Sequence, residues 1–164
     1  MSAIEKYFNG EILQCSIGVA IFIVSIGVGI YFFFWLKQPY YKGLAYAFIL
    51  ISVLLTVVCT SVILKSSKDA QRVTESIASN EHKKIQEEYL RMQNVLKSFK
   101  TLKIAELIIV AVCAILLMVF SNVPLVKGIA TGLIIQALML YAFDYIAMER
   151  GKVYYNYLAD VLGK

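Results

Sequence analysis

Four long stretches without charged residues constrain this chain more than any other feature of its sequence. Residues 12–36, 43–64 and 107–126 contain no Asp, Glu, Lys or Arg, and residues 128–148 contain only Asp144. Each stretch has about the 20 residues that an α-helix needs to cross the roughly 30 Å hydrocarbon core of a bilayer. A backbone in lipid must satisfy its hydrogen bonds internally, which favours helices over open strands.

The composition requires an apolar medium around the chain. Of its 164 residues, 60% are hydrophobic and 16% are charged, whereas soluble domains carry about 25% charged residues. A soluble protein of this length has too little interior to bury so much apolar surface. We therefore predict an all-α integral membrane protein, a single domain over residues 1–164, with four transmembrane helices in a bundle. The spans are expected at about residues 12–36, 43–64, 104–121 and 124–147.

The segment between the second and third spans is the only long polar part of the sequence. Its stretch "IASNEH" divides it, because Ser79 or Asn80 can cap a new helix. We predict that the second and third spans extend into a cytoplasmic helical hairpin over about residues 65–103, and that residues 148–164 form a cytoplasmic tail.

The second arm of this hairpin carries apolar residues at spacings of three and four, which is typical of a heptad seam. The seam consists of Ile85, Tyr89, Met92, Leu96 and Phe99. It either holds the hairpin together or docks a partner protein, because the first arm is poor in apolar residues. Tyr154, Leu158 and Val161 share one face of the tail and could cover part of the seam. In that case partner docking on the seam is less favoured.

The distribution of positive charge predicts the orientation. Thirteen of the sixteen lysines and arginines, Lys164 included, lie in the first tail, in residues 65–103 or in the last tail. Lys and Arg are enriched in cytoplasmic loops, so both termini are expected in the cytoplasm, with the bacterial inner membrane as the cell membrane. The net charge of +5 suits anionic lipid headgroups rather than nucleic acid, since acidic residues are interleaved with the basic ones.

The opening segment has its own predicted geometry. Ile4, Tyr7 and Phe8 share one helical face, which favours a short helix lying along the membrane surface. The pair Asn9-Gly10 is expected to end that helix before the first span.

Glu106 stands at the start of an apolar run, and ionisable groups within membranes are functional candidates. Counting residues down the helices predicts a polar layer at its level, made of Glu106, Thr56, Thr60, Ser61, Gln136 and Tyr141. One interpretation is a satisfied hydrogen bond between helices. The other is a proton or cation site, or the polar end of a cavity.

Asp144 is expected nearer the inner headgroups than Glu106. There it would form an inner-rim ion pair with Lys100 or Lys103 of the neighbouring span. Small residues predict where helix backbones approach one another. They are Gly18, Ser25, Gly29, Gly128 and Gly132, and either packing within one chain or dimerisation would use them.

No residue pattern in the sequence predicts catalysis. There is no set of zinc ligands, no phosphate-binding glycine loop and no Ser/His/Asp set, so no metal, cofactor or enzymatic activity is expected. The layout resembles small four-span bacterial membrane proteins, including immunity and accessory proteins. The missing catalytic pattern, the short outward loops and the incompletely covered seam together predict a non-enzymatic protein that binds a partner protein, or a second copy of itself, through its spans or hairpin. The alternative is a small oligomeric channel or transporter that uses the polar layer.

Overall fold

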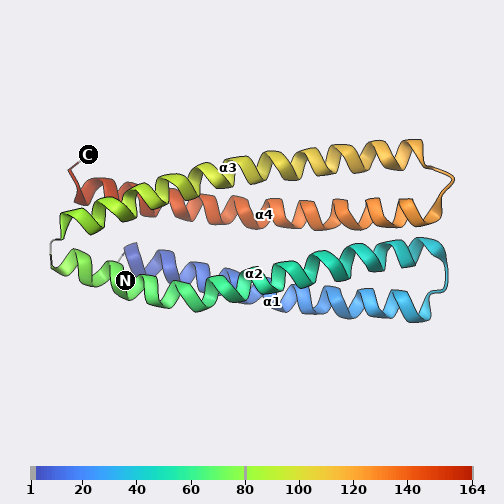
Figure 1. Ribbon diagram of the computed structural model, residues 1–164, viewed down its shortest axis with the longest axis horizontal. Helices are drawn as coiled ribbons and strands as arrows, with labels where there is room; N and C mark the ends of the chain where they lie inside the picture. The colour runs from blue at the N-terminus through green and yellow to red at the C-terminus, as the bar shows by residue number, and fades with distance from the viewer. Residues whose placement is uncertain (1–2, 80, 164) are drawn as a thin grey trace.

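The computed structural model describes residues 3–79 and 81–163, and within them it forms four long helices joined by short turns (Figure 1). The helices are α1 (Ala3–Trp35), α2 (Pro39–Ala78), α3 (His82–Val119) and α4 (Pro124–Val161). Each is long and apolar enough to span a membrane, which confirms the all-helical prediction and indicates a multi-pass membrane protein. Asn80 and Lys164, on which two of the sequence predictions drew, lie outside the described residues.

Local chemistry explains where these helices begin and end. Pro39 and Pro124 open α2 and α4, at positions where a missing backbone N–H costs nothing. The predicted division after the second span is confirmed, but Ser79 closes α2 instead of capping α3. Its backbone N–H and its hydroxyl both donate to the carbonyl oxygen of Glu75, at 3.0 and 2.8 Å.

The expected break at Asn9-Gly10 is wrong. α1 is continuous from Ala3 through both residues. Ile4, Tyr7 and Phe8 are buried against other helices instead of lying on a membrane surface, and this packing keeps the first turns of α1 in line with the span.

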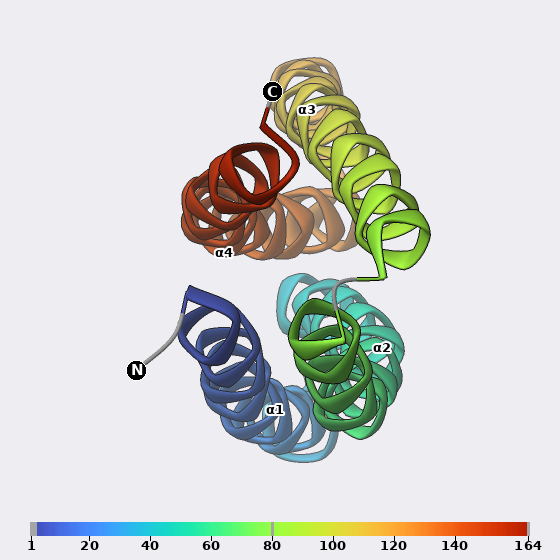
Figure 2. The same ribbon diagram turned by 90° about the vertical axis from the view of Figure 1, so that its left-hand side faces the viewer.

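The helices pack unequally around the bundle (Figure 2). α1 lies along α2, α3 lies along α4, and α2 packs closely on α4. The α1–α4 and α2–α3 pairs touch much less, and within the described residues no Cα atom of α1 lies within 8 Å of one of α3. In cross-section the bundle is therefore a rhombus whose short diagonal is the α2–α4 contact.

Glycines allow that diagonal to be short. A Cβ at Gly128 would overlap the carbonyl oxygen of Tyr40, and one at Gly43 would overlap that of Leu125. A Cβ at Gly132 would lie 2.7 Å from the Cβ of Ala47. The backbones of α2 and α4 thus meet directly, and small residues are what permits such an approach between membrane helices.

Apolar side chains point outward along most of the bundle. In the most apolar window of each helix, only 11% to 28% of the residues are buried. Exposed fractions of 65% for Val24, 62% for Val57 and 80% for Met118 are typical of these windows. Such a surface is stable only in an apolar medium.

The main buried apolar cluster lies at the charged end of the bundle, where both termini and the α2–α3 turn meet (Figure 1). It contains Ile4, Tyr7, Phe8, Val73, Ile85, Met92, Tyr154 and Leu158, drawn from all four helices. The segment 65–103 is therefore not a separate hairpin. Its two arms continue α2 and α3, as expected, but they join a four-helix core, because α1 and α4 supply the apolar residues that the first arm lacks.

The α2–α4 contact gives a test of the fold. Gly128→Ala is expected to lower the free energy of unfolding in detergent by about 2 kcal/mol or more, because the new methyl group would push against backbone atoms. Gly27 has no atom within 4 Å of such a Cβ, so Gly27→Ala should raise stability by up to about 1 kcal/mol. Equal thermal stability of the two variants would contradict the direct backbone contact.

Candidate functional site

A cavity of about 250 Å³ lies between the helices where the charged end meets the apolar part of the bundle. All four helices line it. Its walls are mostly apolar, including Phe22, Leu55 and Leu140, and its polar groups include Glu11, Gln14, Cys15, Cys59, Asp144 and Arg150. The three cysteines of the chain are free thiols. The cavity is therefore amphipathic, with its polar groups on the side of the termini.

Arg150 connects α4 to α1 beside this cavity. Its Nη1–H donates to the carbonyl oxygen of Gly10 at 2.9 Å, and its Nη2–H donates to Gln14 Oε1 at 2.8 Å. Gln14 Nε2–H donates in turn to the carbonyl oxygen of Phe143 at 2.7 Å. Burial lowers the pKa of Arg150. Sequence reasoning used Arg150 only as a positive charge of the tail, because this contact joins residues 140 positions apart.

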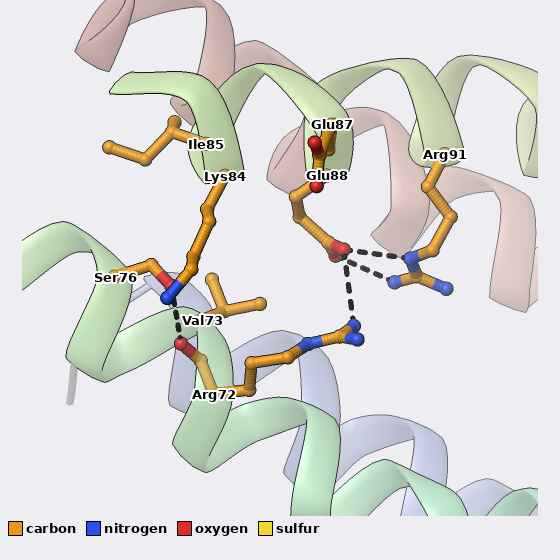
Figure 3. Close-up of a pocket in the computed structure, with 8 residues that line it drawn as sticks. All are labelled: Arg72, Val73, Ser76, Lys84, Ile85, Glu87, Glu88 and Arg91. Carbon is orange, nitrogen blue, oxygen red and sulfur yellow. Dashed lines mark hydrogen bonds and ion pairs between the residues drawn. The ribbon is translucent and has the colours of Figure 1, made fainter. Parts of the chain in front are cut away.

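A second hollow, of about 260 Å³, lies between α2 and α3 close to their turn (Figure 3). Glu88 is its central group, and its side chain is only 5% exposed. Arg91 Nε–H and Nη2–H donate to the two oxygens of Glu88 at 2.8 and 2.7 Å. Tyr154 donates from its hydroxyl at 3.2 Å, and Arg72 Nη2 lies 3.9 Å away. Glu88 thus fastens α3 to α4 and α2.

Glu88 shifts the pKa values of the side chains that donate hydrogen bonds to it. The hydrogen bond to Glu88 raises the pKa of Arg91, and burial together with Glu88 raises that of Tyr154. A carboxylate paired in this way is a structural group rather than a free base. The sequence carried a signal for it, since Glu88 follows Ile85 by three and precedes Met92 by four, which places it on the buried face.

The residues of the predicted polar layer do not contact one another as one layer in the structure, but belong to separate groups. Gln136 is 3% exposed, and its Nε2–H₂ donates to Ser25 Oγ at 3.1 Å and to Ser52 Oγ at 3.0 Å. This triad joins α4, α1 and α2. Thr56, Thr60 and Ser61 each donate to the carbonyl oxygen four residues earlier in α2, and Tyr141 lies under the ammonium group of Lys103. Sequence reasoning missed Ser52.

Glu106 is 8% exposed, and its Oε2 atom is buried without a hydrogen-bond partner among the described residues. The predicted inner-rim pair is not formed within ion-pair distance in the described part of the chain. The ammonium group of Lys103 lies over the rings of Tyr141 and Tyr145, at 5.2 and 4.9 Å, and not against Asp144. Lys100 faces a shallow hollow together with Lys103.

The seam is covered by the chain itself. Ile85 and Met92 are fully buried, and Tyr89 packs beside them with its ring stacked on that of Tyr155. Leu96 lies against Gly151 of α4, and Phe99 lines the central cavity. The tail residues Tyr154 and Leu158 belong to the same cluster, so the seam is not free to dock another protein.

The predicted packing residues lie at contacts within the chain. Ser25 joins the Gln136 triad, and Gly128 and Gly132 meet α2. A Cβ at Gly29 would lie 2.8 Å from Ile49 Cγ1, and one at Gly18 would lie 3.4 Å from Phe143. Sequence reasoning missed Gly43, although Ala47, four positions later on the same helix, completes a small-xxx-small pair with it.

Comparison with family models, with curated proteins and with solved structures found no match for this chain. Among the described residues there is also no group of three or more His, Cys, Asp or Glu side chains that could hold a metal ion. Function is therefore argued from the geometry above.

The Glu88 group gives a second test of the structure. Glu88→Gln is expected to lower the free energy of unfolding by about 2 kcal/mol, because it removes a buried charge that two arginines face. The exposed neighbour Glu87 is the matched control, and Glu87→Gln should change stability by less than about 0.5 kcal/mol. Equilibrium unfolding in detergent measures both changes in the free energy of unfolding. Equal changes in the two variants would contradict the role of Glu88 in holding α3 to α4 and α2.

Proposed function

We propose that this is a non-enzymatic protein of the bacterial inner membrane, with both termini in the cytoplasm, that binds a partner protein through its spans. A subunit, accessory or immunity-type role fits this proposal. The orientation is supported by the charge distribution, since both termini and the α2–α3 turn lie at one end of the bundle (Figure 1). Of the fifteen basic residues that the structure describes, twelve belong to the segments at that end.

The attachment of α3 is the observation that supports a binding role most directly. Between Leu102 and Val119, only Glu106 and Cys113 are buried. They lie seven residues apart, so one narrow line of α3 contacts the bundle. The exposed fractions of Ile108, Ile115 and Met118 are 56%, 58% and 80%. A helix held along one line leaves a wide face on which a transmembrane helix of another protein can pack.

The spans are favoured over the polar segment because the seam of α3 is already covered. A partner on the seam would have to displace Tyr154 and Leu158, both of which are essentially fully buried. Among the described residues, α3 as a whole packs closely on α4 alone.

Photocrosslinking in native membranes tests this proposal. A photoreactive residue at Ile115 is expected to give a discrete protein adduct. The same residue at Val24 should give lipid adducts alone, because Val24 is similarly exposed at 65% and lies on α1, whose backbone within the described residues stays farther than 8 Å from that of α3. An adduct of twice the chain mass would make a second copy the partner. Lipid adducts alone at both positions, or the same protein adducts at both, would remove the proposal.

A small oligomeric channel or transporter is the second candidate function. Two observations favour it: Glu106 Oε2 and Gln136 Oε1 are buried acceptors without partners among the described residues, and an amphipathic cavity lies between the helices. Buried polar atoms in a membrane are costly, so unpaired ones are candidates for contact with a permeating ion.

Flux through proteoliposomes separates the two functions. If partner binding is the function, vesicles with the wild-type chain should leak protons and K⁺ no faster than protein-free vesicles. Glu106→Gln, which preserves the shape of the side chain, should then leave the Ile115 adduct unchanged. Transport predicts the reverse: flux by the wild type, its loss in Glu106→Gln, and its retention in Glu87→Gln. That result would replace the first proposal by the second.

A further inference from the structure

A groove runs along the loosely packed α1–α4 side of the bundle, away from the open face of α3. It consists of two hollows that share Gly10, Ile146 and Arg150. The hollow nearer the termini has a volume of about 780 Å³, and the other has a volume of about 420 Å³. The groove is thus continuous from the charged end into the apolar part of the bundle.

The second hollow is almost entirely apolar. Leu13, Ile17, Ile21, Phe143 and Ile146 line it. Along α1 it extends from Gly10 to Ile21, which at 1.5 Å per residue is about 16 Å. One leaflet contributes about 15 Å to the hydrocarbon core. The apolar length of the groove therefore matches the depth of a single leaflet.

The first hollow brings cations to the mouth of the groove. Lys6, Tyr7, Glu149 and Arg150 line it. The carboxylate of Glu149 is already occupied, because Lys152 Nζ lies 2.6 Å from its Oε1. Glu11 does not line this hollow, and its Oε2 accepts a hydrogen bond from the Ser66 hydroxyl of α2 at 2.6 Å. Lys6 and Arg150 thus give the mouth of the groove a positive character.

Arg150 differs from the other two arginines of the chain. Arg72 pairs with Asp69, and Arg91 pairs with Glu88. Within the described residues, Arg150 has no carboxylate within ion-pair distance. Its two hydrogen bonds use two of the five guanidinium N–H groups, and its buried Nε–H has no partner. The nearby carboxylate of Glu11 acts on Arg150 only from beyond ion-pair distance. A half-buried cation without a directly paired carboxylate is complementary to an anion at this position.

Gly10 explains how Arg150 reaches the groove. A Cβ on Gly10 would lie 2.7 Å from Arg150 Cδ and 3.2 Å from its Nε. The absence of a side chain lets the arginine stem lie flat across α1, with its guanidinium group at the junction of the two hollows.

From these observations we infer that the α1–α4 groove is a binding site for one anionic glycerophospholipid. The phosphate lies at Arg150 and Lys6, and one acyl chain lies along Leu13, Ile17 and Ile146. The charge selects an anionic headgroup, and the leaflet-deep apolar half selects a lipid over free phosphate. This site is independent of the partner proposed for α3, because the residues that line its two hollows belong to α1 and α4.

The test uses the full chain, purified in mild detergent and delipidated. Native mass spectrometry and thermal stability are measured with dioleoyl phosphatidylglycerol, with dioleoyl phosphatidylcholine and with inorganic phosphate. The wild type should retain one phosphatidylglycerol and gain thermal stability from it. It should respond much less to phosphatidylcholine and not at all to phosphate. Arg150→Gln is expected to weaken phosphatidylglycerol binding by about 10-fold or more, since it removes a charge-assisted contact.

Matched variants separate a built site from general attraction to charge. Lys97→Gln removes one positive charge from an exposed position on α3, outside the groove, and should bind like the wild type. Ile17→Trp keeps every charge but fills the apolar hollow, so it should also lose the lipid. This variant keeps the test valid if Arg150→Gln fails to fold. Equal losses in Arg150→Gln and Lys97→Gln, unaltered binding by Ile17→Trp, or equal responses to the two lipids or to phosphate would each overturn the inference.

Discussion

The direct backbone contact between α2 and α4 determines the arrangement of the other helices. Gly43, Gly128 and Gly132 bring these two helices together at the end of the bundle away from the termini, and the Gln136 triad continues the contact into the middle. Because α2 and α4 occupy the centre, α1 and α3 can each pack only on the flanks. The two open sides of the rhombus are a geometric consequence of this short diagonal. The lipid groove and the exposed face of α3 lie on those sides.

The charged end is held together by different forces. There the medium is polar, and a conventional apolar core forms from all four helices around Met92, Tyr154 and Leu158. Glu88 lies at the edge of this core, with its charge compensated by Arg91 and Tyr154. At one end the protein therefore has a buried apolar core like that of a soluble protein. Along the rest of the bundle its apolar side chains point outward, as they do in membrane proteins. The half-buried Arg150 lies at the boundary between these two parts of the bundle, which is where a lipid headgroup would also lie.

Part of the site could be read from the sequence and part could not. Gln136 and Ser25 were recognised because polar and small residues stand out within apolar runs. Ser52, the other acceptor of Gln136, was not identified, because residue counting gives depth along a helix but not the direction in which a side chain points. For the same reason Thr56, Thr60 and Ser61 were assigned to a shared layer with Glu106. Each of these hydroxyls instead donates to its own helix, a local bond that depth alone cannot exclude.

The sequence by itself determined that this chain forms four helices suited to a membrane, and roughly where each begins and ends. Hydrophobic run length, charge and proline position are local properties that act on each helix separately. Only the tertiary structure decided that the seam of α3 is covered by side chains of α1 and α4. It also decided that the side chain of Arg150 packs on Gly10. It also decided which faces stay open. Those outcomes depend on helix rotation and on contacts between residues 66 to 140 positions apart, and the periodicity of a single helix carries no information about either.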